Sequence, residues 1–272
     1  MTKCTLFIEG VGFWAPSLPG WPEARAAFRG TGSTGHAPMS IPSPAALPSA
    51  ERRRASETVS LALAVSEEAV NAAAYQPRDM LAVFTSAHGD LPAIDQLCDT
   101  LARTPRLVSP TRFLHTIHNS PLGVWSVLNS NSRNHTAVSA AECSFAAGLL
   151  EAAALVEMEQ QPVLLVGYDT AATGALVHTT RSQGALAVAL VLSPHPGLHT
   201  TARLDWHLKP GAGEAAEPQT AAGQSLPANG MSQAIPLCEA LAAERAAILS
   251  MRLSNYQDLH LNLRPVTRAT RA

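Results

Sequence analysis

The sequence predicts a layered α/β fold with a sheet that is covered on both faces. Three short runs are apolar throughout and bounded by turn residues, which is typical of buried strands: 80–86, 162–168 and 184–192. Helical patterns alternate with these runs, the strongest over 144–158, and such alternation favours layers of helix and sheet around one core. The chain has 272 residues, of which 46% are hydrophobic, enough for one sizeable core.

The remaining elements follow from periodicity and turn signals. We expect a strand over 5–12 and an irregular excursion, rich in Pro, Gly and Ser, over 15–50. Further helices are expected over 55–74, 92–103, 110–118, 122–128 and 232–251, and further strands over 136–141 and 258–263.

The predicted domain organisation has three parts. Residues 1–208 form the α/β domain, and 209–230, without periodicity, form a flexible linker. Residues 231–272 form a C-terminal helix and strand that pack on the same domain.

Charge and cysteine content exclude several classes of function. The net charge is −2 and the one basic run is short, so no nucleic-acid-binding face is predicted. The four cysteines have no CxxC spacing, which argues against a zinc ribbon or a redox pair. No run approaches the ~20 apolar residues of a membrane span, and the N-terminal residues lack a signal-peptide pattern. We therefore expect a cytoplasmic protein with free thiols and no membrane span.

Cofactor motifs are also missing. There is no GxGxxG, no GxxxxGK[ST] and no GxSxG, so neither nucleotide binding nor an ordinary hydrolase is indicated. His115, His118 and His135 lack a further ligand at a convincing spacing. We expect no cofactor and no metal.

Residues 109–150 carry the most informative pattern. Ser109-Pro110 opens a helix, Asn119 and Gly123 follow, and a small-residue strand over 136–141 leads to Cys143 at the start of another helix. This order resembles the nucleophile region of the β-ketoacyl synthases, within the thiolase-like fold. The opening FIEGVGFWAP and the run GALAVALVL resemble the first and last strands of that family's first half, so the resemblance covers roughly residues 5–195.

A narrower resemblance is to short synthase-like chain-length factors of aryl-polyene and polyketide pathways. It rests on HNSPLGVWS, which begins at His118, and on SFAAGLLEA, which begins at Ser144. The resemblance implies a hetero-oligomer with a full-length β-ketoacyl synthase, acting on acyl chains carried by an acyl carrier protein, with a homodimer as the alternative when the partner is absent. It also implies that the chain shapes the partner's acyl tunnel and so sets product length.

The second half of a complete synthase is missing from the pattern. In the family that half supplies two histidines for the acyl-thioester chemistry. Only 77 residues (272 − 195) follow residue 195, without a His-Gly-Thr or a Gly-Thr-Asn-Ala-His. Since a thiolate without acid/base partners cannot run decarboxylative condensation, the chain is expected to be a single truncated half and a non-catalytic subunit.

Cys143 falls at the family's nucleophile position without a gap. The start of a helix lowers the pKa of a thiol, but the neighbouring carboxylate of Glu142 disfavours the thiolate, and a small buried hydrophobe is the alternative role. We therefore expect Cys143 to be inactive. A small thiol-dependent acyl-thioester enzyme using Cys143, or an acyl-carrier-protein binding module, stay open as alternatives.

The resemblance also implies tunnel and interface residues. In the family, residues just after the Ser-Pro cross the dimer interface and line the neighbouring subunit's acyl pocket, and the strand before the nucleophile pairs with the partner. The positions implied here are Thr111, Arg112, Phe113, Asn119, Thr136, Val138 and Ala140. A charge at an apolar tunnel end needs a partner or solvent, so Arg112 either caps the tunnel or is a surface arginine.

Overall fold

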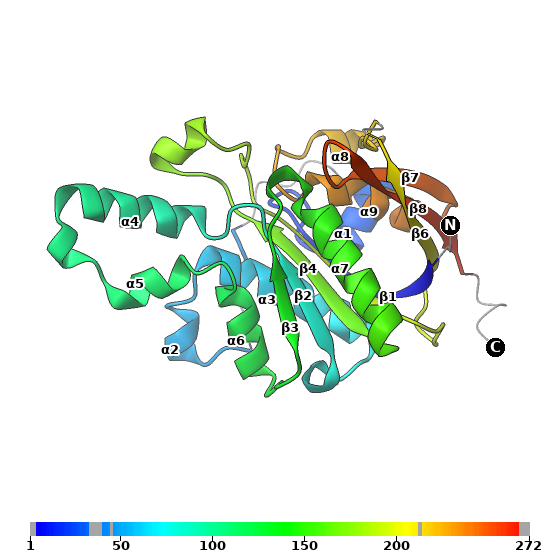
Figure 1. Ribbon diagram of the computed structural model, residues 1–272, viewed down its shortest axis with the longest axis horizontal. Helices are drawn as coiled ribbons and strands as arrows, with labels where there is room; N and C mark the ends of the chain where they lie inside the picture. The colour runs from blue at the N-terminus through cyan, green and yellow to red at the C-terminus, as the bar shows by residue number, and fades with distance from the viewer. Residues whose placement is uncertain (1–3, 33–39, 44–45, 212–213, 267–272) are drawn as a thin grey trace.

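One mixed eight-stranded sheet forms the centre of the molecule in the computed structural model, which describes residues 4–32, 40–43, 46–211 and 214–266, with the backbone alone at Thr111 (Figure 1). The strand order is β3-β2-β4-β5-β1-β6-β8-β7. β2 pairs with β3 and β4 in parallel, and every other neighbouring pair is antiparallel. The strands are β1 (Cys4–Trp14), β2 (Leu81–Thr85), β3 (His135–Val138), β4 (Val163–Asp169), β5 (Leu186–Ser193), β6 (Ala202–Pro210), β7 (Ala247–Arg252) and β8 (Gln257–Pro265).

Helices cover both faces of this sheet. The α-helices are α1 (Trp21–Phe28), α2 (Ser49–Arg52), α3 (Glu57–Ala73), α4 (Leu91–Arg103), α5 (Pro110–His115), α6 (Ser120–Leu128), α7 (Ser144–Glu159), α8 (Ala221–Gln224) and α9 (Ile235–Ala243). The 3-10 helices are η1 (Pro77–Asp79), η2 (Pro105–Leu107), η3 (Ala141–Cys143), η4 (Gly174–His178) and η5 (Ser232–Ala234). α3 and α6 enclose one hydrophobic cluster with the sheet, while α1, α7 and α9 enclose the other. The predicted α/β/α layering is confirmed.

Small residues let α3 lie close to the sheet. A Cβ built at Gly10 or Gly12 of β1 would overlap the carbonyl oxygen of Ala69 or Val65 of α3, respectively. Only glycine permits such a close backbone approach. Gly10 and Gly12 therefore allow β1 to pack directly against the backbone of α3.

The C-terminal part of the chain continues the sheet and differs from the prediction. The predicted helix over 232–251 ends at Ala243, because Glu244 adopts a left-handed conformation with φ of 49°. The residues after it form β7, which pairs with β8, and β6 was not predicted at all. The order β6-β8-β7, with α9 preceding the β7–β8 hairpin, repeats the order β1-β5-β4 with α7 preceding the β4–β5 hairpin. The described residues thus contain a reduced counterpart of the first half.

The segment expected to be a flexible linker, 209–230, contains the end of β6 and α8. The buried carboxylate of Glu239 accepts hydrogen bonds from the backbone N–H groups of Gln219 and Thr220, each at 2.8 Å. The predicted boundary at residue 208 falls inside β6, and the division into domains stays a prediction. The predicted irregular region also contains a regular element, α1, whose Phe28 packs edge-on against Phe13 of β1.

An arm projects from the β3 side of the sheet (Figure 1). We use this name for residues 91–117, which include α4, η2 and α5. Its two ends are fixed to the loop after β2: Asp90 caps α4 by accepting a hydrogen bond from the N–H of Ala93 (3.0 Å), and a ring nitrogen of His118 lies 3.0 Å from the carbonyl oxygen of Ser86. Only the first residue of α4, Leu91, is buried.

None of the described helices has the length and apolar character that crossing a bilayer requires.

Candidate functional site

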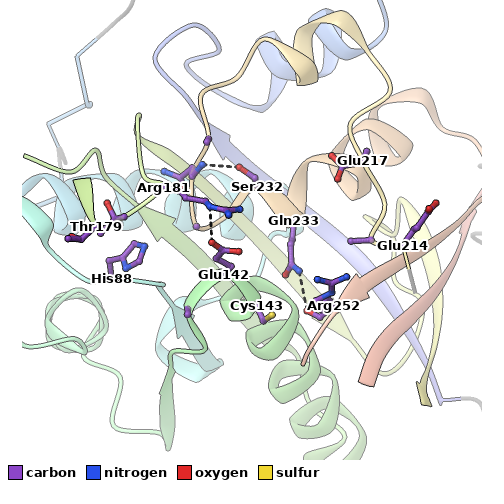
Figure 2. Close-up of a pocket in the computed structure, with 16 residues that line it drawn as sticks. His88, Glu142, Cys143, Thr179, Arg181, Glu214, Glu217, Ser232, Gln233 and Arg252 are labelled. Atoms are coloured by element: carbon purple, nitrogen blue, oxygen red, sulfur yellow. Dashed lines mark hydrogen bonds and ion pairs between the residues drawn. The ribbon is translucent and has the colours of Figure 1, made fainter. Parts of the chain in front are cut away.

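A cavity of about 810 Å³ lies at the N-terminal end of α7 and includes Cys143 in its lining (Figure 2). Four parts of the chain contribute: the loop after β2, the turn before α7, the segment after η4, and C-terminal residues on both sides of α9. The residues with functional side chains are His88, Glu142, Cys143, Thr179, Thr180, Arg181, Glu214, Glu217, Asn229, Ser232, Gln233 and Arg252.

A tight turn places Cys143 at the start of α7. Ala141 adopts a left-handed conformation with φ of 49°. The buried hydroxyl of Ser144 accepts a hydrogen bond from the N–H of Ala140 (2.9 Å) and donates one to the carbonyl oxygen of Ala141 (2.6 Å). A non-glycine residue in that conformation costs about 1 kcal/mol, which these hydrogen bonds offset.

The electrostatic surroundings of Cys143 favour the neutral thiol. Burial raises the pKa of the Cys143 thiol, and Arg252 opposes this while Glu142 and Asp258 add to it. The effect expected of Glu142 is therefore present, although burial is the larger cause. The thiol is thus less ionised than a free cysteine.

One histidine lines the cavity among the described residues, His88. His207 and His260 lie elsewhere, with their rings 5.5 Å apart on β6 and β8. The described residues contain no group of three or more His, Cys, Asp or Glu side chains arranged to hold a metal ion. The cavity therefore offers one histidine beside a thiol whose pKa is raised.

A buried carboxylate organises the loop that carries His88. Asp169, at the end of β4, accepts hydrogen bonds from the Ser86 hydroxyl (2.7 Å) and from the N–H groups of Ala87 (2.9 Å) and His88 (3.2 Å). Burial raises the pKa of Asp169, although these hydrogen bonds oppose it. Asp169 was not among the predicted site residues, although its place directly after the apolar run 162–168 was an available signal.

The mouth of the cavity is bridged by an ion pair. Arg181, which follows η4, lies 3.2 Å from Glu142. The amide of Asn229 donates hydrogen bonds to the carbonyl oxygens of Gly184 (2.6 Å) and Asp169 (3.2 Å). These contacts connect the segment after η4 and the C-terminal lining to the body of the sheet.

Residues 28–257 match the N-terminal domain of the β-ketoacyl synthases. The chain belongs to this family. No curated protein matches the sequence significantly.

Solved structures of the same fold cover nearly the whole chain. A structure of the ketosynthase ApeO in complex with its chain length factor ApeC, from Xenorhabdus doucetiae, matches 96% of this chain and 100% of the matched chain, at 22% identity and a TM-score of 0.71. The ishigamide ketosynthase/chain length factor matches 97% of this chain and 100% of its own, at 16% identity and a TM-score of 0.70. A type II polyketide synthase complex, AntDE with the acyl-carrier protein AntF, matches 97% of this chain and 100% of its own, at 11% identity and a TM-score of 0.72. At these identities the likeness shows the fold, and the thiolase-like fold expected from the sequence is confirmed.

The tunnel residues that the β-ketoacyl synthase family implies lie on the arm, away from the Cys143 cavity. Arg112 and Phe113 of α5 are exposed, and Arg112 has no ion-pair partner among the described residues. The side chain of Thr111 lies outside the described part of the structure. Asn119 is exposed at the start of α6 and makes no side-chain cap there. A role of these residues in a partner's tunnel stays a prediction.

The predicted interface strand is confirmed as an element, but it is shorter than expected. β3 ends at Val138 instead of residue 141, because the chain then enters the turn that precedes α7. Thr136 and Val138 lie on this edge strand, and Ala140 lies in the turn.

Trp125 of α6 is buried against Phe84 and His135, with ring centroids 5.9 and 5.6 Å away. It therefore belongs to the core.

Proposed function

We propose that this chain is a non-catalytic, chain-length-factor-like subunit of a β-ketoacyl synthase pair. It binds a full-length synthase that acts on acyl chains carried by an acyl carrier protein, and it shapes the end of that synthase's acyl tunnel. The product class is a polyene or polyketide. The observation that carries the proposal is the environment of Cys143, where burial raises the pKa of the thiol and one histidine lines the cavity.

The chemistry of condensation explains why this environment matters. A cysteine nucleophile needs a thiolate, and the carbanion formed on decarboxylation needs acid/base or hydrogen-bonding partners. The described cavity offers His88 alone for that role, and Glu142 and burial oppose the thiolate. The catalytic groups would therefore come from another chain.

The edges of the sheet support association through β3. At the other end of the sheet, two carbonyl oxygens of β7 are occupied: that of Ser250 accepts from the N–H of Ala216 (2.8 Å), and that of Arg252 accepts from the side-chain amide of Gln233 (3.1 Å). β3 pairs with β2 only, and its outer edge has no strand beside it among the described residues. An open edge favours pairing with another chain.

The exposed apolar side chains of the arm also indicate that the interface lies on the β3 side of the molecule. Phe113 of α5 is 52% exposed and Leu107 of η2 is 71% exposed. The arm that carries both residues projects from the β3 side of the sheet (Figure 1). Large apolar side chains in one exposed region mark an interaction surface. We expect an interface that buries more than about 2,000 Å² in total. The solved assemblies of ketosynthase with chain length factor support a synthase as the occupant.

Co-expression with a full-length β-ketoacyl synthase from a neighbouring gene, followed by light scattering on the purified material, tests the proposal. We expect a stable complex with both chains in equal amounts. Incubation of the chain alone with acyl thioesters, with free thiol as the readout, separates the proposed subunit from a thiol enzyme. A monomer at micromolar concentration that binds no synthase, or thiol release that requires Cys143, would contradict the proposal.

A further inference from the structure

A side-chain contact joins the arm to a second exposed element, η4. The hydroxyl of Thr173, the residue before η4, donates a hydrogen bond to the carboxylate of Asp95 in α4 (3.1 Å). In Figure 1 the yellow-green segment that contains η4 runs beside α4 near the base of the arm. α4 buries only its first residue in this chain, so this contact adds a specific link between its second turn and the rest of the chain, beside its packing against η2 and α5.

The joint is also close-fitting at its backbone. Gly174 adopts a left-handed conformation with φ of 52°, and a Cβ built there would overlap both carboxylate oxygens of Asp95. Only glycine allows the carboxylate to lie directly against the backbone in this conformation. The residue types at 95, 173 and 174 therefore fit one another across the two elements.

The arm and η4 both expose large hydrophobic side chains. Among the described residues, eleven large hydrophobic side chains are exposed, and six of them lie on the arm or on η4: Leu101, Leu107, Phe113, Leu114, Ile117 and Val177. These six side chains of the arm and η4 are not covered by other parts of the described chain. The joint therefore connects the arm, which carries five of these side chains, to η4, which carries Val177.

We propose that Asp95 is a positioning residue that locks η4 to the arm, so that both elements meet the synthase partner as one preorganised surface. This inference rests on the proposed function and extends the docking surface from β3 and the arm to η4. Preorganisation lowers the entropy that binding must remove. Residues 179–181 follow η4 and line the cavity, where Arg181 pairs with Glu142, so the joint also connects the docking surface to the cavity mouth.

The test compares Asp95→Ala with Asp99→Ala. Asp99 lies one turn further along α4 and pairs with Arg103 of the same helix (2.7 Å), so it is a matched control. We expect Asp95→Ala to weaken binding to the co-expressed full-length synthase about three- to tenfold, and to increase deuterium uptake over residues 173–182 of the free chain. Asp99→Ala should leave deuterium uptake over residues 173–182 unchanged, because Asp99 takes no part in the contact with η4, and should weaken synthase binding less than Asp95→Ala. Asp95→Asn keeps an acceptor for Thr173 and should restore most of the wild-type behaviour.

A double-mutant cycle tests the fit at Gly174. Gly174→Ala should weaken synthase binding in the wild-type background and weaken it less in the Asp95→Ala background, because the overlapping carboxylate is gone. Unchanged deuterium uptake in Asp95→Ala would show that the joint does not hold η4 and would overturn the inference. Increased uptake with unchanged affinity would remove η4 from the docking surface and overturn it as well. A wild-type chain that binds no synthase would overturn the proposed function, whereas the first two outcomes leave that function intact.

Discussion

Glu142 and Arg181 form an ion pair, 3.2 Å long, at the mouth of the cavity that contains Cys143. Both side chains are largely exposed, so the pair contributes little to stability. Glu142 matters for the neighbouring residue instead: it directly precedes Cys143, and its carboxylate raises the pKa of the thiol, after burial as the main cause.

The first prediction concerns the reactivity of this thiol. Because a raised pKa lowers the thiolate fraction at pH 7, Cys143 should be alkylated by iodoacetamide more slowly than the exposed Cys98. Glu142→Gln removes a charge that raises the pKa and should speed alkylation of Cys143 about two- to fivefold, and Arg252→Gln should slow it. Peptide mass spectrometry over time gives both rates. Faster labelling of Cys143 than of Cys98 would contradict this account.

A second prediction is that Cys143→Ala leaves the output of the reconstituted synthase pair nearly unchanged. The reason is that the described cavity gives the thiol a raised pKa and one histidine, so the partner performs the chemistry. Product yield is measured by mass spectrometry, with light scattering to check assembly. Loss of output in an intact complex would favour catalysis by Cys143.

The third prediction concerns the open edge of β3. The N–H of Ser86 donates to the carbonyl oxygen of Val138 (3.3 Å). Because backbone N–H and C=O groups alternate in direction along a strand, those of Thr136 and Val138 point toward β2, and those of Ala137 point to the open edge. Ala137→Pro should leave the sheet folded and weaken synthase binding at least tenfold. Thr136→Pro removes a donor that faces β2 and should destabilise the fold itself. Equal synthase binding by folded Ala137→Pro and wild type would show that this edge is not the interface.

A fourth prediction tests the buried carboxylate of Asp169. Asp169→Asn places an amide N–H₂ against backbone N–H donors and should lower the free energy of unfolding by about 1–3 kcal/mol. Burial raises the pKa of Asp169, so the folded chain binds this proton more readily than the unfolded chain. Its contribution to stability is therefore largest below the usual aspartate pKa of about 3.9 and falls as the pH rises. Urea unfolding at several pH values measures the difference between wild type and variant.

The control for this experiment is Asp79→Asn. Asp79 is exposed and forms an ion pair with the equally exposed Arg78 at 3.5 Å, so its replacement should change stability by less than about 0.5 kcal/mol. A similar loss for both variants would mean that the hydrogen bonds of Asp169 are not what stabilises the loop after β2.

Part of this fold could be predicted from the sequence because some strands are buried on both faces. β2, β4 and β5 are fully buried, and their uniform apolar runs identify them. In β6, the apolar residues Ala202, Leu204, Trp206 and Leu208 alternate with polar ones, which is the pattern of a half-buried strand, so the sequence did carry a signal for β6, of a different kind from the uniform apolar runs. β7 follows α9 after three residues, so its helical neighbours in the sequence obscure it. For β7, therefore, pairing with β8 decides the structure.

The candidate site likewise contains one residue that local sequence predicts and others that it does not. The position of Cys143 at the start of α7 follows from a continuous local pattern, and the structure places it there. Asp169, Arg181 and Arg252 reach the same region from separate parts of the chain, and no local signal connects them. The roles of Thr111 and Arg112 come from the family resemblance alone, because their proposed contacts lie in another subunit.

The most direct test of the central claim is the length distribution of acyl products made by the reconstituted synthase pair, measured by mass spectrometry. With assembly intact, Thr111→Phe should shorten the products, and Thr111→Ala and Arg112→Ala should lengthen them. Arg106→Ala, which changes an exposed arginine elsewhere on the arm, should have no effect. An unchanged length distribution across the three variants at positions 111 and 112 would contradict the proposal that this chain sets product length through the arm.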